Sequence, residues 1–347
     1  MVFLNVFSSR ILSFLGLSSQ VDMMIWMFQL VLFADGVWGT RTLESLLQSP
    51  LLEVQAVVLR KNPSDDSLEE LAKRENLTIL QPEKVNSPSC RKVLLEFDSQ
   101  LFVSMSYDQI FKKQTYSIAT LGAINCHAGK LPWYRGRSIL NWVLIEGESE
   151  FGITVHQIDE TIDTGGIIKQ EVFPISDEDD YATLMETALK ECPRLLAQAV
   201  EEIAISGQIK LQSQTEIDPT GSYYPRRKSG DERVVWDWGA RKIFNFVRAL
   251  VPPGPMAQSQ TRRGEVHSFL KVLPCDKSGN FLQSSEEIGQ LFSSSEVKPG
   301  IFKRIDNHKV AVICREGVVI LRTKDPVNEE FGCYVSEQQG QSDDRLN

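Results

Sequence analysis

The sequence predicts an α/β protein with a Rossmann-like, mostly parallel sheet that carries helices on both faces, followed by a small C-terminal β-barrel-like domain. Short β-rich runs alternate with helical runs between residues 28 and 206, a cadence typical of a parallel sheet covered by helices. After residue 265, short β-rich runs follow one another at close spacing, as in a small barrel or sandwich. The chain has 347 residues, of which 42% are hydrophobic and 24% charged, and this composition suits two globular domains.

The elements of the first domain follow from their apolar patterns. Buried strands are expected where β-branched and aromatic residues cluster in short runs, and helices where apolar residues recur every three or four positions. The expected strands are 28–33, 52–59, 78–80, 101–104, 123–125 and 152–158. The expected helices are 40–48, 89–96, 138–146 and 181–206, with a turn at 34–39 and an acidic loop and helix at 64–76. Ligands of such sheets bind at the carboxyl ends of the strands, so we expect the functional residues there.

A second region follows a polar linker. An amphipathic helix is expected at 240–250, and a proline-rich run, 252–255, ends it. The expected strands of this region are 266–273, 300–305, 309–314 and 317–323, after a short apolar run at 234–236. We therefore divide the chain into a catalytic domain (27–217), a linker (218–230), a helix with a small β domain (231–330) and a tail (331–347).

The first residues are interpreted separately. Asp22 separates two apolar runs, 1–19 and 23–34. Neither run reaches the roughly 20 residues that cross a bilayer, so no membrane association is expected. Met27 directly precedes the first expected strand. We interpret residues 1–26 as an extension outside the fold, or as a misassigned start, with a weak organelle-targeting or signal segment as the alternative.

Charge and cysteine usage argue against several classes of function. The formal net charge is -9 and the pI about 5.2, whereas a surface that covers a long stretch of nucleic acid needs concentrated Lys and Arg. A small anionic substrate remains compatible with this charge. The six cysteines include no Cys-x-x-Cys pair, so neither a zinc site nor a disulfide framework is suggested. We expect no metal and a reducing, cytoplasmic setting.

The candidate chemistry lies in Asn125-Cys126-His127 and in Asp163, which follows His127 by 36 positions. Asn offers a fixed amide donor, His transfers a proton near neutral pH, and Asp can hold a His in one tautomer. Together they suit acyl transfer, because an amine that attacks a carbonyl creates an oxyanion and releases a proton. Cys126 would point to the opposite side of its strand, which argues against a nucleophilic role.

Simpler interpretations of these residues stay open at this point. An Asn-x-His pair can be a turn with a satisfied polar group, and Asp163 can cap a helix. His156 alternates with apolar residues on its strand and could contact a ligand, but we favour an exposed or core-edge position. Gly36 and Gly39 form neither a Gly-x-Gly-x-x-Gly fingerprint nor a P-loop, so they suit a turn better than a dinucleotide cradle.

One long pattern includes the candidate residues. It runs Asn125-Cys126-His127-Ala128-Gly129-Lys130-Leu131-Pro132-Trp133-Tyr134-Arg135-Gly136-Arg137, then Asn141-Trp142, Gly147-Glu148, Phe151-Gly152-Ile153-Thr154-Val155-His156 and Ile162-Asp163-Thr164-Gly165. This pattern closely resembles the folate-dependent formyltransferases, which use 10-formyltetrahydrofolate and include methionyl-tRNA, glycinamide ribonucleotide and sugar nucleotide formyltransferases. The resemblance covers roughly residues 27–325 and is most specific over 122–168.

The resemblance implies roles for individual residues. Asn125 would stabilise the oxyanion, His127 would transfer the proton, and Asp163 would set the charge state of His127. It implies 10-formyltetrahydrofolate as co-substrate, bound by Gln109, Ile110, Phe111, Arg137, Asp159, Glu160, Thr161 and Ile162. Many members have Ser-Leu-Leu-Pro where this chain has residues 129–132, and an acidic residue where Gly166 stands. These departures concern the acceptor more than the chemistry.

Two acceptors compete within the resemblance. An initiator tRNA would need a basic insertion after the second strand, whereas residues 60–66 are short and turn acidic. The segment 223–228 resembles the linker of amino-sugar formyltransferases, with aromatics that can stack a base and cations that can pair a diphosphate. We therefore expect a nucleotide-linked amino-deoxy sugar and no tRNA. The expected acceptor-binding residues are Trp38, Tyr223, Tyr224 and Arg226.

Several alternatives remain. Methionyl-tRNA formyltransferase is the nearest of them, and a solvated loop is the simpler interpretation of the charged run 226–228. A formyltetrahydrofolate hydrolase or a non-catalytic folate-binding protein would be a different class, although the intact Asn125, His127 and Asp163 argue against a silent protein. The second domain would shape the acceptor pocket or form a homodimer contact, and its composition does not decide between these roles.

Overall fold

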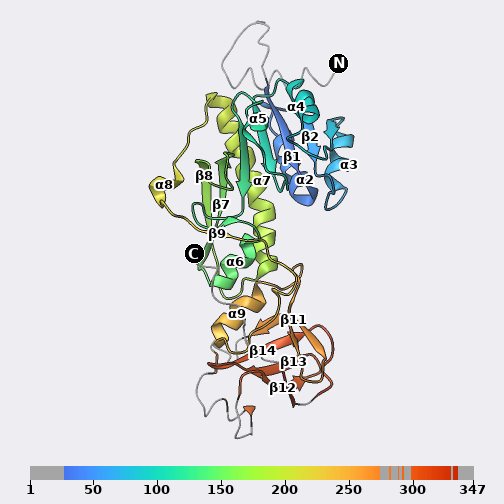
Figure 1. The fold of residues 1–347 in the computed structure, drawn as a ribbon, viewed down its shortest axis with the longest axis vertical. Coiled ribbons are helices and arrows are strands. Elements are labelled where there is room, and N and C mark those ends of the chain that lie inside the picture. The colour runs from blue at the N-terminus through green and yellow to red at the C-terminus, as the bar shows by residue number, and fades with distance from the viewer. Residues whose placement is uncertain are drawn as a thin grey trace.

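Seven strands form the sheet that positions the site (Figure 1). The computed structural model describes residues 27–273, 281–282, 288, 291–292, 298–329 and 331–334. The strands are β1 (Phe28–Ala34), β2 (Leu52–Leu59), β3 (Thr78–Leu80), β4 (Leu101–Met105), β5 (Ala123–His127), β7 (Glu150–Gln157) and β8 (Ile167–Pro174). Their spatial order is β3-β2-β1-β4-β5-β7-β8; the first five are parallel, and the pairs β5–β7 and β7–β8 are antiparallel. The mostly parallel sheet predicted from the sequence is confirmed.

Helices cover both faces of this sheet, as predicted. They are α2 (Gly36–Leu47), α3 (Ser67–Arg74), α4 (Pro88–Leu95), α5 (Lys113–Tyr116), α6 (Ile139–Glu146) and α7 (Tyr181–Ser206). α2 and α7 pack in the apolar cluster that contains Leu32 and Val103, whereas α4 packs in the cluster that contains Phe33 and Phe102. Successive strand residues alternate between these clusters because strand side chains point to opposite faces. None of the helices in the described ranges is long and apolar enough to cross a membrane.

α2 and β8 are among the elements that differ from the sequence prediction. α2 begins at Gly36, so its first residues occupy most of the segment that was assigned to the turn 34–39. Gly36 has a φ of +48°, a conformation that glycine adopts readily, and it lets the chain pass from β1 into the helix within two residues. β8 has no counterpart in the prediction, because the polar run 169–171 interrupts the apolar alternation that identifies a strand.

The second domain is a six-stranded antiparallel sheet, in agreement with the predicted small β domain. Its strands, in spatial order, are β10 (Ala257–Gln260), β11 (Val266–Leu273), β14 (Val318–Thr323), β13 (Lys309–Ile313), β12 (Ile301–Asp306) and β15 (Phe331–Cys333). Trp236 stacks on Tyr334 with 5.0 Å between ring centroids, and Phe302 packs against Tyr334 at 4.7 Å. β15 lies within the segment assigned to the tail, so the sheet continues past residue 330. Residues 1–26 and 335–347 lie outside the described residues.

The helix α9 (Ala240–Arg248) joins the second domain to the first (Figure 1). Arg248 Nη1 donates to the carbonyl of Ser176 at 2.7 Å, and Arg241 pairs with Asp177 at 2.7 Å. Arg248 is only 5% exposed, so this contact is part of the packed interface. The two domains are therefore held by polar contacts of defined geometry as well as by apolar packing.

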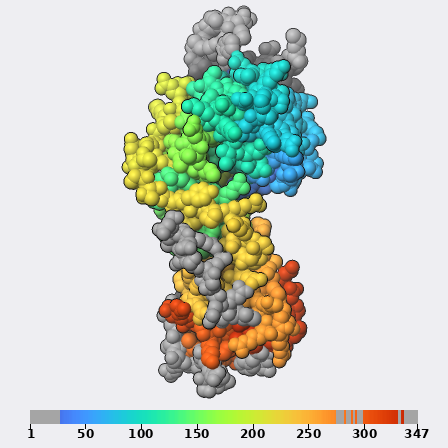
Figure 2. All heavy atoms as spheres, in the orientation of Figure 1, coloured from blue at the N-terminus to red at the C-terminus, as the bar shows by residue number. Residues whose placement is uncertain are grey.

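The linker packs along the first domain. After α8 (Gln214–Ile217), the short strand β9 (Tyr223–Tyr224) pairs in parallel with β6 (Arg135–Gly136). In the space-filling view, the yellow part of the chain passes over the first domain and reaches the waist between the domains (Figure 2). The segment between the domains is therefore bonded to the part of the chain that follows β5.

His267 makes the second domain sensitive to acid. Its side chain is buried, and its Nδ1 lies 2.8 Å from the Tyr334 hydroxyl. Burial lowers the pKa of His267 below its ordinary value of 6.5, although the Glu265 carboxylate 3.7 Å from Nε2 acts in the opposite direction. As the pH falls through the ordinary value, the unfolded chain binds a proton that the folded domain binds less readily, so the free energy of unfolding decreases.

We expect urea unfolding to show a loss of stability between about pH 7 and pH 5 that is smaller in His267→Gln than in the wild type. His308→Gln, which makes the same change at a partly exposed histidine of the same domain, is the matched control for the substitution. An equal pH dependence in His267→Gln and the wild type would contradict the assignment.

Candidate active site

The carboxyl ends of three parallel strands meet in one row. Ser104 of β4 is in register with Asn125 of β5, and β1 pairs with β4 on the other side. The next row toward the carboxyl ends lies two residues further along each strand. It contains Asp35 after β1, Ser106 after β4 and His127 at the end of β5. Polar side chains therefore gather at the edge of the sheet where the sequence predicts ligand binding.

Asn125 and His127 lie on the same face of β5, and Cys126 lies on the other. The Cys126 thiol points toward α7, where it donates to the carbonyl of Cys192 at 3.6 Å. The thiol is buried in the apolar cluster of α2 and α7. The prediction that Cys126 points away from its two neighbours is confirmed, and the thiol takes no part in the site.

The structure brings Asp163 to His127, as the sequence suggests. Asp163 Oδ2 lies 3.6 Å from His127 Nδ1 and accepts a hydrogen bond from Gly136 N at 2.9 Å. Asp163 Oδ1 lies 3.5 Å from Nε2 of a second histidine, His156. The Asp163 backbone has a φ of +57°, a left-handed conformation that Asp tolerates better than most residues. This conformation turns the carboxylate back over the sheet, between the two imidazoles.

The carboxylate of Asp163 is only 12% exposed, so its charge needs compensation. Burial by itself would raise the pKa of Asp163. The positive charge that His127 carries when protonated and the hydrogen bond from Gly136 N outweigh burial and hold that pKa below its usual range. Asp163 is therefore a carboxylate throughout the physiological pH range.

Both ring nitrogens of His127 face acceptors. Nε2 lies 2.7 Å from the carbonyl of Tyr134, and Nδ1 faces Asp163. This approach requires glycine at position 129, because a Cβ there would lie 2.5 Å from His127 Nε2 and 2.6 Å from Tyr134 O. The Gly-Lys-Leu-Pro segment thus gives His127 room to reach its carbonyl partner.

His156 lies beside Asn125 and Asp163, although the sequence favoured an exposed or core-edge position for it over contact with a ligand. It is 2% exposed, and its Nε2 accepts from Asn125 Nδ2 at 3.2 Å while its Nδ1 donates to the carbonyl of Gln157 at 2.9 Å. The expected exposed or core-edge position is therefore wrong. The pairing of β5 with β7 places His156 directly opposite Asn125. A strand register of this kind cannot be read from residue types, although the alternation of His156 with apolar residues was a signal of burial on one face.

The expected folate-binding residues lie on two loops and one turn. Phe111 is buried against Phe33 with 4.8 Å between ring centroids, whereas Ile110 is 60% exposed. In the second loop, Asp159 accepts from Thr161 and Thr164, and Ile162 is 42% exposed. A 3.9 Å ion pair between Lys113 and Glu160 links the loops. Arg137 is exposed, and its backbone N–H donates to the carbonyl of Tyr224.

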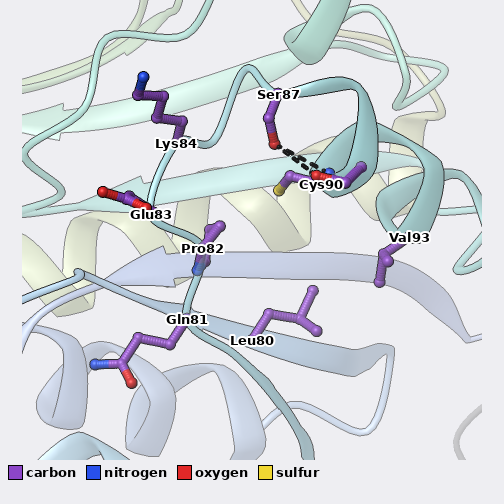
Figure 3. Close-up of a pocket in the computed structure, with 9 residues that line it drawn as sticks. Leu80, Gln81, Pro82, Glu83, Lys84, Ser87, Cys90 and Val93 are labelled. Carbon is purple, nitrogen blue, oxygen red and sulfur yellow. Dashed lines mark hydrogen bonds between the residues drawn. The ribbon is translucent and has the colours of Figure 1, made fainter.

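The side chain of Gln109, an expected folate-binding residue, is hydrogen-bonded to the protein backbone. Its Oε1 accepts from Val85 N at 2.8 Å and its Nε2 donates to Pro82 O at 3.4 Å, so it fixes the segment after β3. That segment borders a cavity of about 460 Å³ between β3 and α4 (Figure 3). The cavity is lined by Leu80, Gln81, Pro82, Glu83, Lys84, Ser87, Ser89, Cys90 and Val93. None of the expected catalytic residues lines it.

The expected acceptor residues do not form one cluster. Trp38 is partly buried against the apolar core of α2 and α7, whereas Tyr223 is 57% exposed and Arg226 is exposed. Tyr224 stacks face to face on Tyr134, with 4.8 Å between centroids and an angle of 4°. One face of Tyr224 is therefore already covered by the protein.

The turn after β1 is closed by an ion pair. Asp35 is 3% exposed, lies 3.1 Å from Arg60 Nη1 and accepts from Ser64 N at 2.9 Å. Arg60 also donates to the backbone carbonyl of Ser106, so it ties the ends of β1, β2 and β4 together. Arg60 is thus a structural cation. In the described part of the chain, no group of three or more His, Cys, Asp or Glu is placed to hold a metal ion.

The space at Gly129 is a testable constraint. We expect Gly129→Ala to separate His127 from Tyr134 and to lower the free energy of unfolding by about 1–3 kcal/mol, the usual cost of an added methyl in a packed interior. Gly239→Ala is the control, because a Cβ there meets no atom closer than 3.3 Å. Urea unfolding measures both variants. Equal stability of the two variants would show that the site tolerates the extra atom.

The chain matches one enzyme family over both domains. Residues 53–200 match the formyl transferase family, and residues 227–328 match the formyl transferase C-terminal domain. A methionyl-tRNA formyltransferase of Thermodesulfovibrio yellowstonii is 35% identical over 193 residues, which is 55% of this chain and 61% of the relative. A methionyl-tRNA formyltransferase of Enterococcus faecalis is 32% identical over 235 residues, or 65% of this chain and 74% of the relative.

Solved structures share the fold over most of the chain. A sugar 3N-formyl transferase crystallised in the presence of dTDP and 5-N-formyl-THF has a TM-score of 0.62 and 20% identity, covering 87% of this chain and 99% of that one. An N-formyltransferase of Helicobacter canadensis, in complex with folinic acid and dTDP-3-aminofucose, has a TM-score of 0.63 and 19% identity, covering 86% and 100%. From the matched domains and the extended identity with its relatives, this chain belongs to the formyl transferase family.

Proposed function

We propose that this protein transfers a formyl group from 10-formyltetrahydrofolate to the amine of a nucleotide-linked amino-deoxy sugar. The convergence of Asn125, His127 and Asp163 at the carboxyl edge of the sheet carries the proposal. These side chains come from a strand and from a loop 36 residues away, and they form one set of polar contacts. Family membership makes formyl transfer the reaction that such a set would catalyse.

The two loops beside these residues suit a folate. Ile110 and Ile162 each present an exposed apolar side chain, which flat aromatic rings can cover. The carboxylates of Asp159 and Asp163 and the backbone of the second loop offer polar groups to the pterin edge. The two related structures described above contain 5-N-formyl-THF or folinic acid, which supports a folate as formyl donor here.

The proposed mechanism assigns one task to each catalytic residue. When bound, 10-formyltetrahydrofolate supplies the activated formyl group that the acceptor amine attacks. Asn125 donates one amide N–H to His156 and keeps the other for the formyl oxygen, where negative charge develops. Neutral His127 carries its ring N–H on Nε2, toward Tyr134 O, so Nδ1 takes the proton that the amine loses as the new C–N bond forms. The bond between the formyl carbon and the folate nitrogen then breaks, and that nitrogen receives the proton. Asp163 keeps the imidazole of His127 oriented and stabilises its positive charge.

The linker supports a nucleotide sugar as acceptor. Tyr223 and Arg226, three positions apart in the linker, are both exposed and offer an aromatic surface for a base and a cation for a diphosphate. Tyr224 is held against Tyr134, so it would shape this surface instead of turning freely. The related structures contain dTDP or dTDP-3-aminofucose, and the net charge of -9 does not favour a long polyanion.

Initiator methionyl-tRNA is the second candidate acceptor, and two observations favour it. The relatives with 35% and 32% identity are methionyl-tRNA formyltransferases. In addition, Arg322 of β14 pairs in register with Lys271 of β11 and with Lys309 of β13, which places three cations side by side on one sheet. Cations in a row can follow a phosphate backbone, so the sheet of the second domain offers a local basic strip despite the acidic total charge.

In the decisive assay, every reaction contains the protein and 10-formyltetrahydrofolate. Separate reactions then receive dTDP- or UDP-linked amino sugars, initiator methionyl-tRNA, or buffer alone. We expect a formyl mass gain on one nucleotide sugar and its loss in His127→Ala, because that variant lacks the proton-transfer group. Folate binding, followed by fluorescence, should persist in His127→Ala.

Each other outcome has a definite meaning. A mass gain on the tRNA alone refutes the sugar and keeps the chemistry. Formate released without any acceptor identifies a hydrolase. Full turnover by His127→Ala refutes the catalytic role of His127.

His156 provides a separate prediction about the orientation of Asn125. We expect His156→Leu to lower kcat about tenfold or more, because Asn125 loses the acceptor that fixes its amide and a well-placed oxyanion donor contributes 10²–10³-fold. His156→Gln, which can still accept a hydrogen bond, should recover part of the loss. His308→Leu in the second domain is the control. A wild-type kcat in His156→Leu would show that Asn125 needs no such support.

A further inference from the structure

Gln214 is a buried amide with every hydrogen-bonding atom in use. It is 2% exposed, at the start of α8. Its Nε2 donates to the carbonyls of Asp163 and Gly165, both at 2.8 Å. Its Oε1 accepts from Arg135 Nε at 3.0 Å and from Arg135 Nη2 at 2.8 Å. One side chain thus satisfies two donors and two acceptor lone pairs, which is the full capacity of a glutamine.

One pair of these bonds holds the loop that carries the catalytic carboxylate. Asp163 has a left-handed backbone, which is less favourable than an extended or helical one and persists only where neighbours fix it. Gly165, two residues on, lies so close to Gln157 that a Cβ would be 1.8 Å from its carbonyl oxygen. Gln214 donates hydrogen bonds to the carbonyls of Asp163 and Gly165, at either end of this segment. It therefore fixes the backbone from which the Asp163 carboxylate projects.

The other pair of bonds holds the segment that contacts both catalytic groups. Tyr134 O lies 2.7 Å from His127 Nε2, and Gly136 N donates to Asp163 Oδ2 at 2.9 Å. Arg135 lies between these two contacts, and Gln214 Oε1 accepts two of its three side-chain hydrogen bonds; the third goes from Arg135 Nη1 to Thr220 O at 3.4 Å. The loop of Asp163 and the segment 134–136 are thereby joined by a single side chain.

We infer that Gln214 is a positioning residue that sets the distance between Asp163 and His127 by clamping the Asp163 loop to the segment 134–136. It touches neither reacting group with its own side chain, so it acts through the backbone of Asp163 and through Arg135. The inference rests on the proposed function for its kinetic consequence. The geometric consequence, displacement of Asp163 and of the two imidazoles, does not depend on any substrate.

The test compares Gln214→Met, which keeps the length of the side chain and removes its polar atoms, with the wild type. We expect kcat to fall about 10- to 100-fold with little change in either KM, since a displacement of about 1 Å in a catalytic group costs that much. The chain has four histidines, and two of them, His267 and His308, lie in the second domain. In NMR spectra of labelled histidine rings, the His127 and His156 resonances should shift while those two stay in place.

The controls separate positioning from folding. Gln100→Met changes another hydrogen-bonded glutamine, whose Oε1 accepts from Gln29 N at 3.0 Å at the start of β1 and β4, and it should leave kcat and the histidine resonances unchanged. If Gln214→Met does not fold, Arg135→Met breaks the same clamp from the other side and should move the His127 resonance. Unmoved resonances together with wild-type kcat, in whichever of these two variants folds, would overturn the inference. If the wild type transfers no formyl group, the proposed function fails, and the NMR comparison still decides whether the clamp exists.

Discussion

The structure depends on keeping a charged carboxylate, Asp163, in a nearly dry position between two imidazoles. A buried charge is costly unless opposite charges and hydrogen-bond donors compensate it. Here the compensation comes from His127 and from the backbone N–H of Gly136, which belong to separate segments, and His156 lies on the other side of the carboxylate. The chain must therefore bring β5, the loop after β7 and the segment after β5 to one point. The positive φ of Asp163 and the absence of a side chain at position 129 serve that purpose.

The antiparallel strand β7 explains how the sheet can do this. In a purely parallel sheet the site would consist of loops beyond the strand ends. Because β7 runs antiparallel to β5, His156 lies directly beside Asn125 within the sheet, and the loop after β7 folds back until Asp163 reaches both imidazoles. The proposed catalytic groups thus lie on the face of the sheet as well as at its edge. A network of this kind fixes orientation better than loops alone, because its side chains are attached to rigid strands.

The sequence was sufficient for some of this site and insufficient for the rest. The alternation of strands and helices predicts the sheet, and the ordered pattern around Asn125 singles out the three proposed catalytic residues, since both depend on residue type and spacing. The position of His156 depends on which residue it faces across a strand pair, so residue type alone assigned it wrongly. The orientation of Tyr224 depends on its stack with Tyr134, a contact that residue type does not reveal. β8 was missed because three successive polar residues remove the alternation, although the strand is bonded along its whole length to β7.

The segment 134–136 connects the catalytic groups to the linker, and this has a consequence for acceptor selection. Within this segment, Tyr134 contacts His127 and Gly136 contacts Asp163. Residues 135 and 136 pair with β9, where Tyr224 stacks on Tyr134 and lies against Trp142. The indole of Trp142 in turn donates to the carbonyl of Pro225 in the linker. If the acceptor binds at the linker as proposed, it acts on a strand pair whose other member contacts His127, the proposed proton-transfer residue. Acceptor recognition and alignment of the proposed catalytic groups would then share one structural element, and a poorly fitting acceptor would lower turnover as well as binding.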